Sequence, residues 1–289
     1  MADIVELGGK SMATPEVLVF DLTGDGRIGR VEIFIQTPAG RQAVRRYAQN
    51  MLFAVPDSVP DEVAVFADPF SVSLHAITRH PPPSSGRVVV YGAGSLGLCA
   101  LAVLRALYPQ AAVAVVARFD AQAQLARRLG ADKVLPHEPR LAVVEELAAW
   151  GSGRLRQPLQ GLPMAYPGAV DVVYDTVGKP ETFEVGGVRV LKARGTLVKA
   201  GVHAPGRWEW SPLYFKEINW VGSNAFGVEE VDGQRKHAIA HYLDLVVDGR
   251  VGLRPMLTHT FRLEQWRDAF LAIANQGESG AVKVAIDFR

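Results

Sequence analysis

Gly92-Ala93-Gly94-Ser95-Leu96-Gly97 follows the apolar run Arg87–Tyr91 and opens a helical pattern that continues to Leu107. Each glycine in this stretch has a mechanical task. Gly92 allows a tight strand-to-helix turn, Gly94 lets the backbone approach a pyrophosphate, and Gly97 lets helix and strand pack closely. The N-terminus of the helix then presents free N–H groups and a positive dipole end to phosphates. The stretch therefore predicts a dinucleotide-binding turn between a buried strand and a helix.

Outward from this turn, short valine-rich runs alternate with helical patterns. Runs that are apolar on consecutive positions are expected where both faces of a sheet are covered. Strands are expected at Arg87–Tyr91, Val113–Ala117, Lys133–Leu135, Val170–Tyr174, Thr196–Ala200 and Ile218–Gly222. Helices are expected at Leu96–Leu107, Ala121–Leu129, Leu141–Trp150 and Glu181–Leu191. This order predicts an α/β fold with a Rossmann-type doubly wound parallel sheet and right-handed crossovers.

The segments around this alternating region have a different character. Residues 16–20 and 31–35 alternate like a β-hairpin, which predicts a small, incomplete, mostly-β partner domain. Prolines and glycines between residues 151 and 168 predict an irregular surface loop. Later segments predict helices at His237–Val247 and Leu263–Ala274 and a closing strand at Val282–Phe288. The expected domains are 1–67, a dinucleotide-binding domain at 68–223, and a C-terminal segment at 224–289 that returns to the partner domain.

Composition narrows the class of protein. The 289 residues are 48% hydrophobic and 21% charged, and the net charge is +1. This near-neutral balance argues against a nucleic-acid or anionic membrane partner. No apolar stretch approaches the roughly 18 residues of a membrane span, and the N-terminus lacks the layout of a signal peptide. Cys99 is the single cysteine, so no intrachain disulfide forms. We therefore expect a cytoplasmic protein.

A clue to the type of dinucleotide follows the strand expected at Val113–Ala117. Folds that select NAD usually end their second strand in Asp or Glu, about 20 residues beyond the glycines. Ala117 and Arg118 stand at this position here. A guanidinium can pair bidentately with a 2′-phosphate, so the pattern favours NADP over NAD. NAD stays open as the alternative, because Asp120 lies close enough to serve as the ribose-binding acid.

Several further stretches occur in a characteristic order: Ala54-Val55-Pro56-Asp57-Ser58-Val59-Pro60, residues 67–76, residues 125–132, residues 171–178 and residues 283–288. Together with the glycine turn they resemble the medium-chain dehydrogenase/reductase family, the zinc-type alcohol dehydrogenases, from about Tyr47 to Arg289. The resemblance implies that Thr176, Val177, Ala200, Gly201 and Val202 line the nicotinamide side of the cofactor and that Lys283 reaches its pyrophosphate or ribose. With these, the expected cofactor-binding residues are Gly92, Gly94, Ser95, Leu96, Gly97 and Arg118. The resemblance also implies a homodimer through the strand at Ile218–Gly222.

The departures from this family concern zinc. Its members carry a barrel-like N-terminal catalytic domain with the zinc ligands, so residues 1–67 are expected to be a truncated remnant of that domain. Asp68 matches a glutamate ligand of polyol-dehydrogenase-like relatives, but the Cys and His companions are missing. Because zinc catalysis needs three protein ligands, we predict no catalytic zinc. Asp68 is instead expected to cap the helix that begins near Pro69, and Cys99 to belong to the core.

Two other patterns have a metal-binding and a simpler interpretation. Residues 21–32 match much of a calcium-binding loop, but their flanks resemble strands, so a plain hairpin turn is favoured over calcium. His237 and His241 are four residues apart on an expected helix. No third ligand is evident, so we expect them on a solvated helix face.

The resemblance implies an oxidoreductase that transfers a hydride between NADP(H) and the carbonyl or alcohol group of a small molecule. Tyr47, His75 and Asp68 are the candidates for polarising the carbonyl, and the sequence does not choose between them. A second interpretation is a cofactor-binding protein with little or no dehydrogenase activity, because its catalytic domain is incomplete. A zinc-independent quinone-type reductase lies between the two. An aromatic group is expected to pack in the core, with a substrate cleft as its alternative: Trp208, Trp210, Tyr214, Phe215 and Trp220.

Overall fold

The computed structural model describes the backbone of residues 4–7, 10–13, 15–22, 28–37 and 40–48, and then residues 53–158, 161–204, 206–209 and 211–287 in full. The chain forms two compact units, Met1–Val55 and Pro56–Arg289. No helix among the described residues is long and apolar enough to cross a membrane.

The first unit consists of antiparallel strands. Strands β1 (Ile4–Leu7) and β2 (Lys10–Ala13) form one hairpin, and β3 (Pro15–Leu22), β4 (Ile28–Thr37) and β5 (Gly40–Ala48) form a three-stranded sheet. This confirms the predicted hairpin. Residues 23–27, at the centre of the calcium-loop pattern, lie outside the described residues, so calcium binding there stays a prediction.

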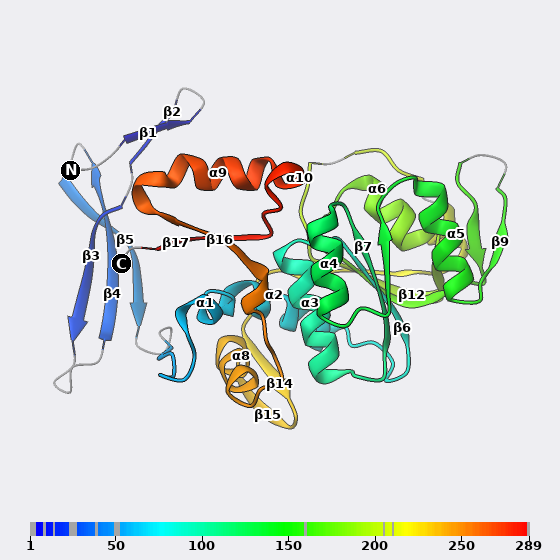
Figure 1. The fold of residues 1–289 in the computed structure, drawn as a ribbon, viewed down its shortest axis with the longest axis horizontal. Coiled ribbons are helices and arrows are strands. Elements are labelled where there is room, and N and C mark those ends of the chain that lie inside the picture. The colour runs from blue at the N-terminus through cyan, green and yellow to red at the C-terminus, as the bar shows by residue number, and fades with distance from the viewer. Residues whose placement is uncertain are drawn as a thin grey trace. The chain divides into compact units, whose positions relative to one another are not determined.

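The second unit is built on a parallel sheet of six described strands in the order β13-β12-β11-β6-β7-β8 (Figure 1). The strands are β6 (Arg87–Tyr91), β7 (Ala112–Ala117), β8 (Lys133–Pro136), β11 (Val170–Asp175), β12 (Leu191–Lys199) and β13 (Asn219–Gly222). Every neighbouring pair is parallel. This is the strand order of a dinucleotide-binding Rossmann fold, whose ligand site lies where the order reverses, between β6 and β11. The predicted fold class is confirmed.

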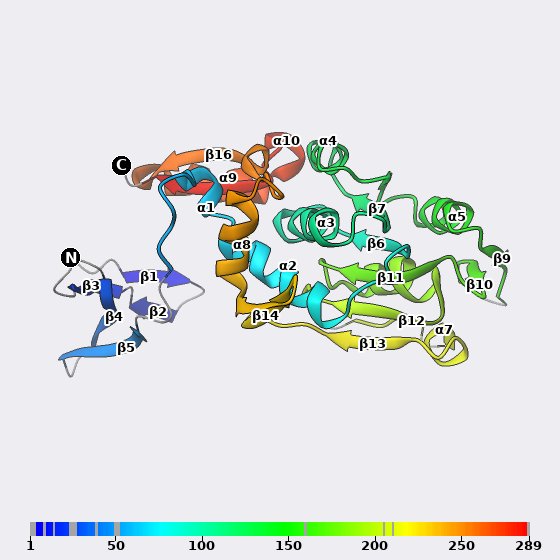
Figure 2. The ribbon, with the colours of Figure 1, turned by 90° about the horizontal axis from the view of Figure 1, so that it is seen from below.

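Helices cover both faces of this sheet, as Figure 2 shows. One face carries α2 (Ala67–Arg79), α3 (Ser95–Leu107) and α4 (Asp120–Arg128), and the other carries α5 (Arg140–Trp150) and a shorter helical segment at 180–188. The core on the second face joins alternate strand residues such as Val89 and Val173 to Val144 and Leu147 of α5. Coverage of both faces explains why the strands are apolar on consecutive positions.

Two expected elements differ from the structure. The predicted loop at 151–168 contains a hairpin of β9 (Arg154–Arg156) and β10 (Met164–Tyr166). The predicted helix at Glu181–Leu191 is a short α6 (Pro180–Thr182) followed by a π-helical turn, η2 (Phe183–Val188). A Cβ on Gly186 would lie 2.0 Å from the Tyr91 ring, so the turn passes closer to β6 than a side chain allows. A helical periodicity in the sequence does not report such a close approach.

The remaining elements surround the sheet. They are α1 (Asp61–Ala64), α7 (Ser211–Phe215), β14 (Val228–Val231), β15 (Gln234–His237), α8 (Ala238–Val247), η3 (Arg254–Met256), β16 (Leu257–Arg262), η4 (Leu263–Gln265), α9 (Trp266–Ala274), α10 (Gln276–Ser279) and β17 (Lys283–Asp287). Strands β16 and β17 pair in parallel, and α9 packs on them. The helix expected at Leu263–Ala274 therefore starts with one 3-10 turn before α9 begins.

The expected cap of α2 is wrong. Phe66 occupies the position before the helix, and no described side chain caps it. Asp68 lies inside the first turn, where its negative charge faces the positive end of the helix dipole. The expected start at Pro69 is two residues too late, because this proline is the third residue of the helix and not the first.

Candidate cofactor-binding site

The glycine turn after β6 is sterically confined at two of its three glycines. Gly92 has φ +102°, and a Cβ there would lie 2.6 Å from Thr176 Oγ1. A Cβ on Gly97 would lie 1.9 Å from the Gly92 carbonyl oxygen. Gly94 differs, because a Cβ there would meet no atom within 4 Å. The first and third glycines therefore allow the turn and the close helix packing, and the second leaves open space above the backbone.

The N-terminus of α3 opens into this space. No described side chain caps the helix, so its first N–H groups are available to an acceptor from outside the chain. Ser95 Oγ donates a hydrogen bond of 2.9 Å to the Val282 carbonyl. This contact brings the start of β17, and with it Lys283, to the first turn of α3. Phosphate groups are the acceptors that such an end prefers.

A cavity of about 780 Å³ lies over the carboxyl ends of the parallel strands. Eight of the predicted cofactor-binding residues line it: Gly92, Gly94, Ser95, Leu96, Gly97, Arg118, Thr176 and Val177. Four others, namely Ala200, Gly201, Val202 and Lys283, are not part of its lining. Gly201 nevertheless packs against the Thr176–Val177 backbone, because a Cβ on it would lie 2.5 Å from the Thr176 carbonyl carbon. The structure thus brings the β11 and β12 ends together at one side of the cavity.

Asp175, at the end of β11, organises this side, and sequence reasoning had not singled it out. Its buried Oδ1 accepts hydrogen bonds from the N–H groups of Val177 (3.0 Å) and Gly178 (2.9 Å) and from Thr182 Oγ1 (3.0 Å). Burial raises the pKa of Asp175 above its usual value, against the effect of these hydrogen bonds. The carboxyl group holds the turn that forms this wall of the cavity. An acidic residue directly after an apolar strand was the available signal.

At the other side, the β7 end carries the residues predicted to choose between NAD and NADP. Arg118 is exposed, and its guanidinium carbon lies 5.0 Å from the centroid of the Phe119 ring. Its backbone N–H donates to Gln122 Oε1. Asp120, the rival ribose-binding acid, is the first residue of α4 and is not part of the cavity lining. This favours Arg118 as the charged group that faces a ligand here.

Three charged or titratable residues after β8 also line the cavity, although the sequence analysis had not named them: His137, Glu138 and Arg140. Arg140 Nε lies 3.4 Å from Glu138 Oε1. Both side chains of this pair are about half exposed, so the pair is worth little on its own. The residues were missed because they belong to no motif and reach the cavity only through the pairing of β7 with β8.

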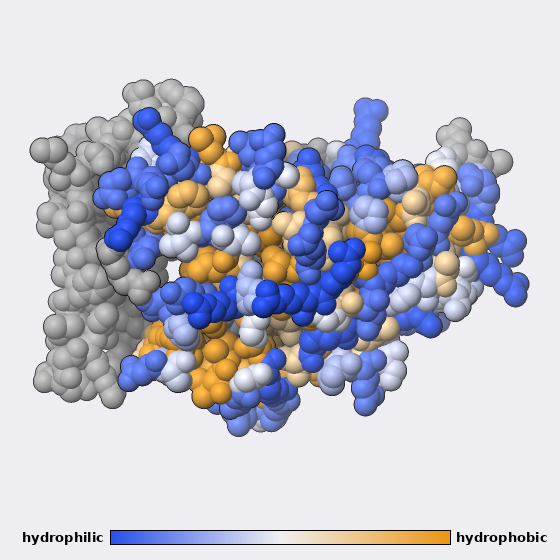
Figure 3. All heavy atoms as spheres, viewed as in Figure 1, coloured by the Kyte–Doolittle hydropathy of each residue, from blue (hydrophilic) through white to orange (hydrophobic). Residues whose placement is uncertain are grey.

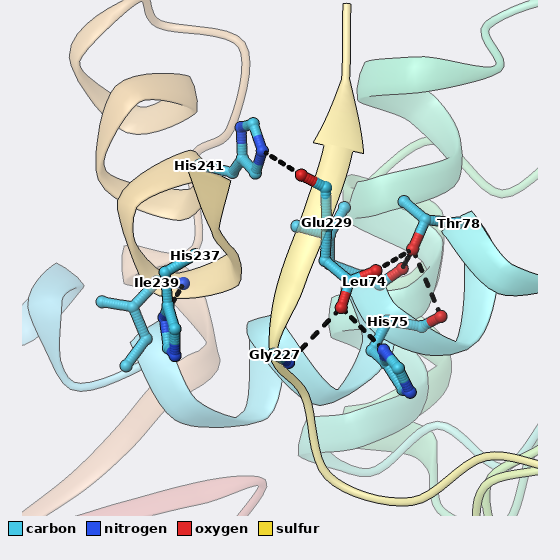
Figure 4. Close-up of polar contacts among 8 residues, drawn as sticks. All are labelled: Leu74, His75, Thr78, Gly227, Glu229, His237, Ile239 and His241. Atoms are coloured by element: carbon cyan, nitrogen blue, oxygen red, sulfur yellow. Dashed lines mark hydrogen bonds and ion pairs between the residues drawn. The ribbon is translucent and has the colours of Figure 1, made fainter. Parts of the chain in front are cut away.

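The histidines and the acid proposed from sequence do not line this cavity, and Figure 4 shows the contacts of the histidines. His75 Nδ1 on α2 lies 2.6 Å from Glu229 Oε1 of β14, and Thr78 Oγ1 donates to Glu229 Oε2 over 2.7 Å. Hydrogen bonds from Thr78 and His75 outweigh the burial that would raise the pKa of Glu229 and hold it below its usual value. Neither His75 nor Asp68 lines the cavity. The side chain of Tyr47 lies outside the described residues.

The expectation of a solvated His237–His241 face is wrong. His237 precedes α8 and caps it, since its Nδ1 accepts from the Ile239 N–H over 3.3 Å. His241 is buried, and its Nε2 donates to the Glu229 carbonyl over 3.1 Å (Figure 4). The two rings therefore serve different partners. Sequence spacing located the helix but not its first residue.

The described residues offer no group of three His, Cys, Asp or Glu side chains placed to hold a metal ion. Cys99 is fully buried in α3, as predicted, and burial raises the pKa of its thiol far above the usual value. Of the aromatic group, Trp208 and Trp220 pack around Phe183, whereas Tyr214 and Phe215 are exposed. Trp210 lies outside the described residues.

Comparison with known proteins agrees with this fold. Residues 95–240, about half of the chain, match the family model described as zinc-binding dehydrogenase. The chain therefore belongs to the zinc-binding dehydrogenases, within the medium-chain dehydrogenase/reductase family that the motifs resemble.

Curated relatives include an alcohol dehydrogenase of Cupriavidus necator, 29% identical over 83% of this chain and 60% of that protein. Another is a probable D-xylulose reductase of Aspergillus terreus, 28% identical over 82% of this chain and 62% of that protein. The chain thus spans about three fifths of the length of the curated relatives it matches.

Solved structures share the fold. An Escherichia coli alcohol dehydrogenase complexed with NADH matches with a TM-score of 0.67 at 18% identity, over 89% of this chain and 77% of that chain. A zinc-binding dehydrogenase from Sinorhizobium meliloti bound to NADP matches with a TM-score of 0.63 at 22% identity, over 86% of this chain and 65% of that chain.

Proposed function

We propose that the protein is an NAD(P)-dependent oxidoreductase of the alcohol dehydrogenase type, acting on a small carbonyl compound or alcohol with NADP(H) as its preferred cofactor. The observation that carries this proposal is the cavity of about 780 Å³ over the Gly92–Gly97 turn. It lies at the reversal point of a Rossmann sheet, where dinucleotides bind. Relatives named as alcohol dehydrogenase and D-xylulose reductase support the reaction class.

The residues fit a dinucleotide from end to end. The first N–H groups of α3 and the open space above Gly94 would hold the pyrophosphate, with Ser95, Leu96 and Lys283 beside it. Thr176, Val177 and the neighbouring Ala200–Val202 segment would position the nicotinamide ring. When bound, the cofactor supplies the hydride chemistry, and the chain provides binding and orientation.

We assign the preference for NADP to Arg118. It lines the cavity at the β7 end, where a 2′-phosphate lies in a dinucleotide fold. Asp120 is outside this lining, so no carboxylate directly follows β7 to repel the phosphate. NAD remains the alternative cofactor, because Glu138 also lines the cavity and offers a carboxylate to a ribose hydroxyl.

The described residues do not fit a catalytic zinc ion, since none of them form a three-ligand group. We propose that they support the reaction without one. We also propose that β13, at the edge of the sheet, pairs two copies into a homodimer. A second candidate function is cofactor binding with little or no turnover. It is favoured because neither Asp68 nor His75, the described candidates for polarising a carbonyl, lines the cavity.

A titration of the full chain with NADPH and NADH, followed by nucleotide fluorescence, tests the cofactor. Arg118→Ala should weaken NADPH binding about tenfold to a hundredfold, the loss of a charge-assisted hydrogen bond of about 1.5–3 kcal/mol. NADH binding should change little. Arg128→Ala, an exposed arginine at the end of α4, is the matched control. Equal affinity for both cofactors, unchanged in Arg118→Ala, would remove the 2′-phosphate role.

Turnover separates the two functions. A panel of simple alcohols and aldehydes, with quinones and enones added, is followed through NADPH absorbance. Consumption of NADPH supports the oxidoreductase, and quinone or enone turnover alone supports a quinone-type reductase. NADPH binding without turnover across the panel favours the binding protein.

A further inference from the structure

A second pocket, of about 170 Å³, adjoins the cofactor cavity beyond the Thr176–Gly201 side. We call it the tryptophan pocket. Six of its lining residues carry the argument: Lys179, Phe183, Lys199, His203, Trp208 and Trp220. It shares Lys179 and His203 with the cofactor cavity, so the two spaces are neighbours.

One wall of the tryptophan pocket is aromatic. The ring centroid of Phe183 lies 4.0 Å from that of Trp208 and 4.7 Å from that of Trp220, and the two tryptophans are 5.7 Å apart. The two contacts of Trp220 have the separation and geometry of edge-to-face aromatic pairs, and the tilted Phe183–Trp208 pair is closer still. Phe183 is buried, while Trp220 on the edge strand β13 is 42% exposed. The wall is therefore anchored in the core and open at its outer end.

The rest of the lining carries positive charge. Lys199 Nζ donates to the Gly178 carbonyl over 3.1 Å, which fixes the ammonium group at the end of β12. Lys179 and Lys199 are both half-buried, and none of the described lining residues is acidic. The nearby Asp175 interacts electrostatically with Lys199, while its Oδ1 accepts the hydrogen bonds of the turn from Val177, Gly178 and Thr182. The pocket therefore has two lysines with no carboxylate of its own.

We propose that the tryptophan pocket binds the ring and the carboxylate of an aromatic carboxylic acid. A flat ring packs against the aromatic wall, and the carboxylate pairs with Lys199 and Lys179. Its volume suits a single ring, because cavities of about 150 Å³ accept benzene. The inference that the bound acid is a substrate rests on the proposed function. The binding of its ring and carboxylate in the pocket does not.

The test uses the full chain and benzoate as the probe, followed by tryptophan fluorescence and by calorimetry. Benzoate should bind and change the fluorescence, and its neutral analogue benzamide should bind at least about tenfold more weakly. Lys199→Met should weaken benzoate binding by about tenfold or more, as expected for a partly desolvated charge pair. Trp220→Leu should weaken benzoate and benzamide alike.

Matched controls test whether the loss of any lysine or any tryptophan weakens benzoate binding. Lys133→Met removes a lysine from β8, at the opposite edge of the sheet, and Trp266→Leu removes a tryptophan of similar exposure on α9. Both should bind benzoate like the unchanged chain. Absence of benzoate binding, equal affinity for benzamide, or equal losses in the controls would overturn the proposal.

Cofactor binding is measured in the same samples. Benzoate should bind with and without saturating NADPH, because the pocket lies beside the cofactor cavity. Competition between benzoate and NADPH would overturn the proposal, since it places the acid in the cofactor cavity. Benzoate binding in a chain that fails to bind NADPH would support the pocket and reject the proposed function alone.

Discussion

Helices α3 and α9 are both rich in apolar residues, yet they lie in opposite environments. In α3 every residue from Gly97 to Leu104 is buried between the sheet and α2. In α9 only Ala269 is fully buried, and Phe270 is 68% exposed. Apolar side chains reach the surface around α8 and α9 in Figure 3. The difference shows that an apolar pattern predicts a helix, while its burial depends on which elements the topology places beside it.

The largest effect on the free energy of unfolding should come from truncating a buried side chain of α3. Leu101→Ala in α3 removes a fully buried side chain and should lower the free energy of unfolding by about 2–5 kcal/mol. Phe270→Ala in α9 is the matched variant and should cost less than about 1 kcal/mol, because the ring is mostly exposed. Urea unfolding followed by circular dichroism measures both. Equal losses would mean that α9 is covered in solution.

The second test compares two glycines of the Gly92–Gly97 turn, one confined and one beside open space. Gly97→Ala places a Cβ against the Gly92 carbonyl and should lower the free energy of unfolding by about 1–3 kcal/mol and abolish NADPH binding. Gly94→Ala has open space and an ordinary φ of −77°, so its stability should change by less than about 0.5 kcal/mol. Its NADPH affinity should still fall, because the methyl group occupies the approach to the pyrophosphate. Thermal unfolding measures the stability of both variants, and nucleotide titration measures their NADPH affinity. A Gly97→Ala chain as stable as the unchanged chain would contradict the packing argument.

The smallest effect concerns the polar contacts that fix α2, on which α3 packs, to β14. The pKa of Glu229 lies below its ordinary value of 4.5 in the folded chain. Its carboxylate therefore stabilises the fold above that pH, and the stabilisation is lost as the pH falls through the lowered pKa. Glu229→Gln should cost about 1 kcal/mol at pH 7, and the cost should fall as the pH drops through the lowered pKa.

Denaturation at several pH values measures this effect. Glu230→Gln, an exposed acid on the same strand, is the control and should show no such dependence. A pH-independent loss in Glu229→Gln would instead assign its role to packing.

Much of the fold could be predicted from local patterns. The strand at Arg87–Tyr91 was placed to the residue, and α3 began one residue before the expected Leu96. The π-helical turn at Phe183–Val188 could not be predicted, because it follows from the approach of Gly186 to Tyr91, far away in sequence. The cap formed by His237 was missed because the capping residue depends on where β15 ends.

The residues of the candidate site also fall into those that the sequence located and those that it did not. The glycine turn, Arg118 and Thr176 were located from sequence, since each belongs to a motif at a fixed spacing. Arg140 and His203 were not, because they belong to no motif and reach the cavity only in the folded chain. Asp175 was also missed, although it directly follows an apolar run. The domain boundaries expected at residues 67 and 223 remain predictions; the chain divides into two compact units after Val55.

By itself the sequence determined the parallel sheet and the place of the dinucleotide turn, because buried strands and glycine-dependent turns are local demands of backbone and burial. Only the tertiary structure decided that Asp175 holds the far wall of the cavity and that Phe183, Trp208 and Trp220 meet beside two lysines. Those residues come from separate strands and loops, and their contacts exist only once the strand order has brought the carboxyl ends of β11, β12 and β13 to one edge.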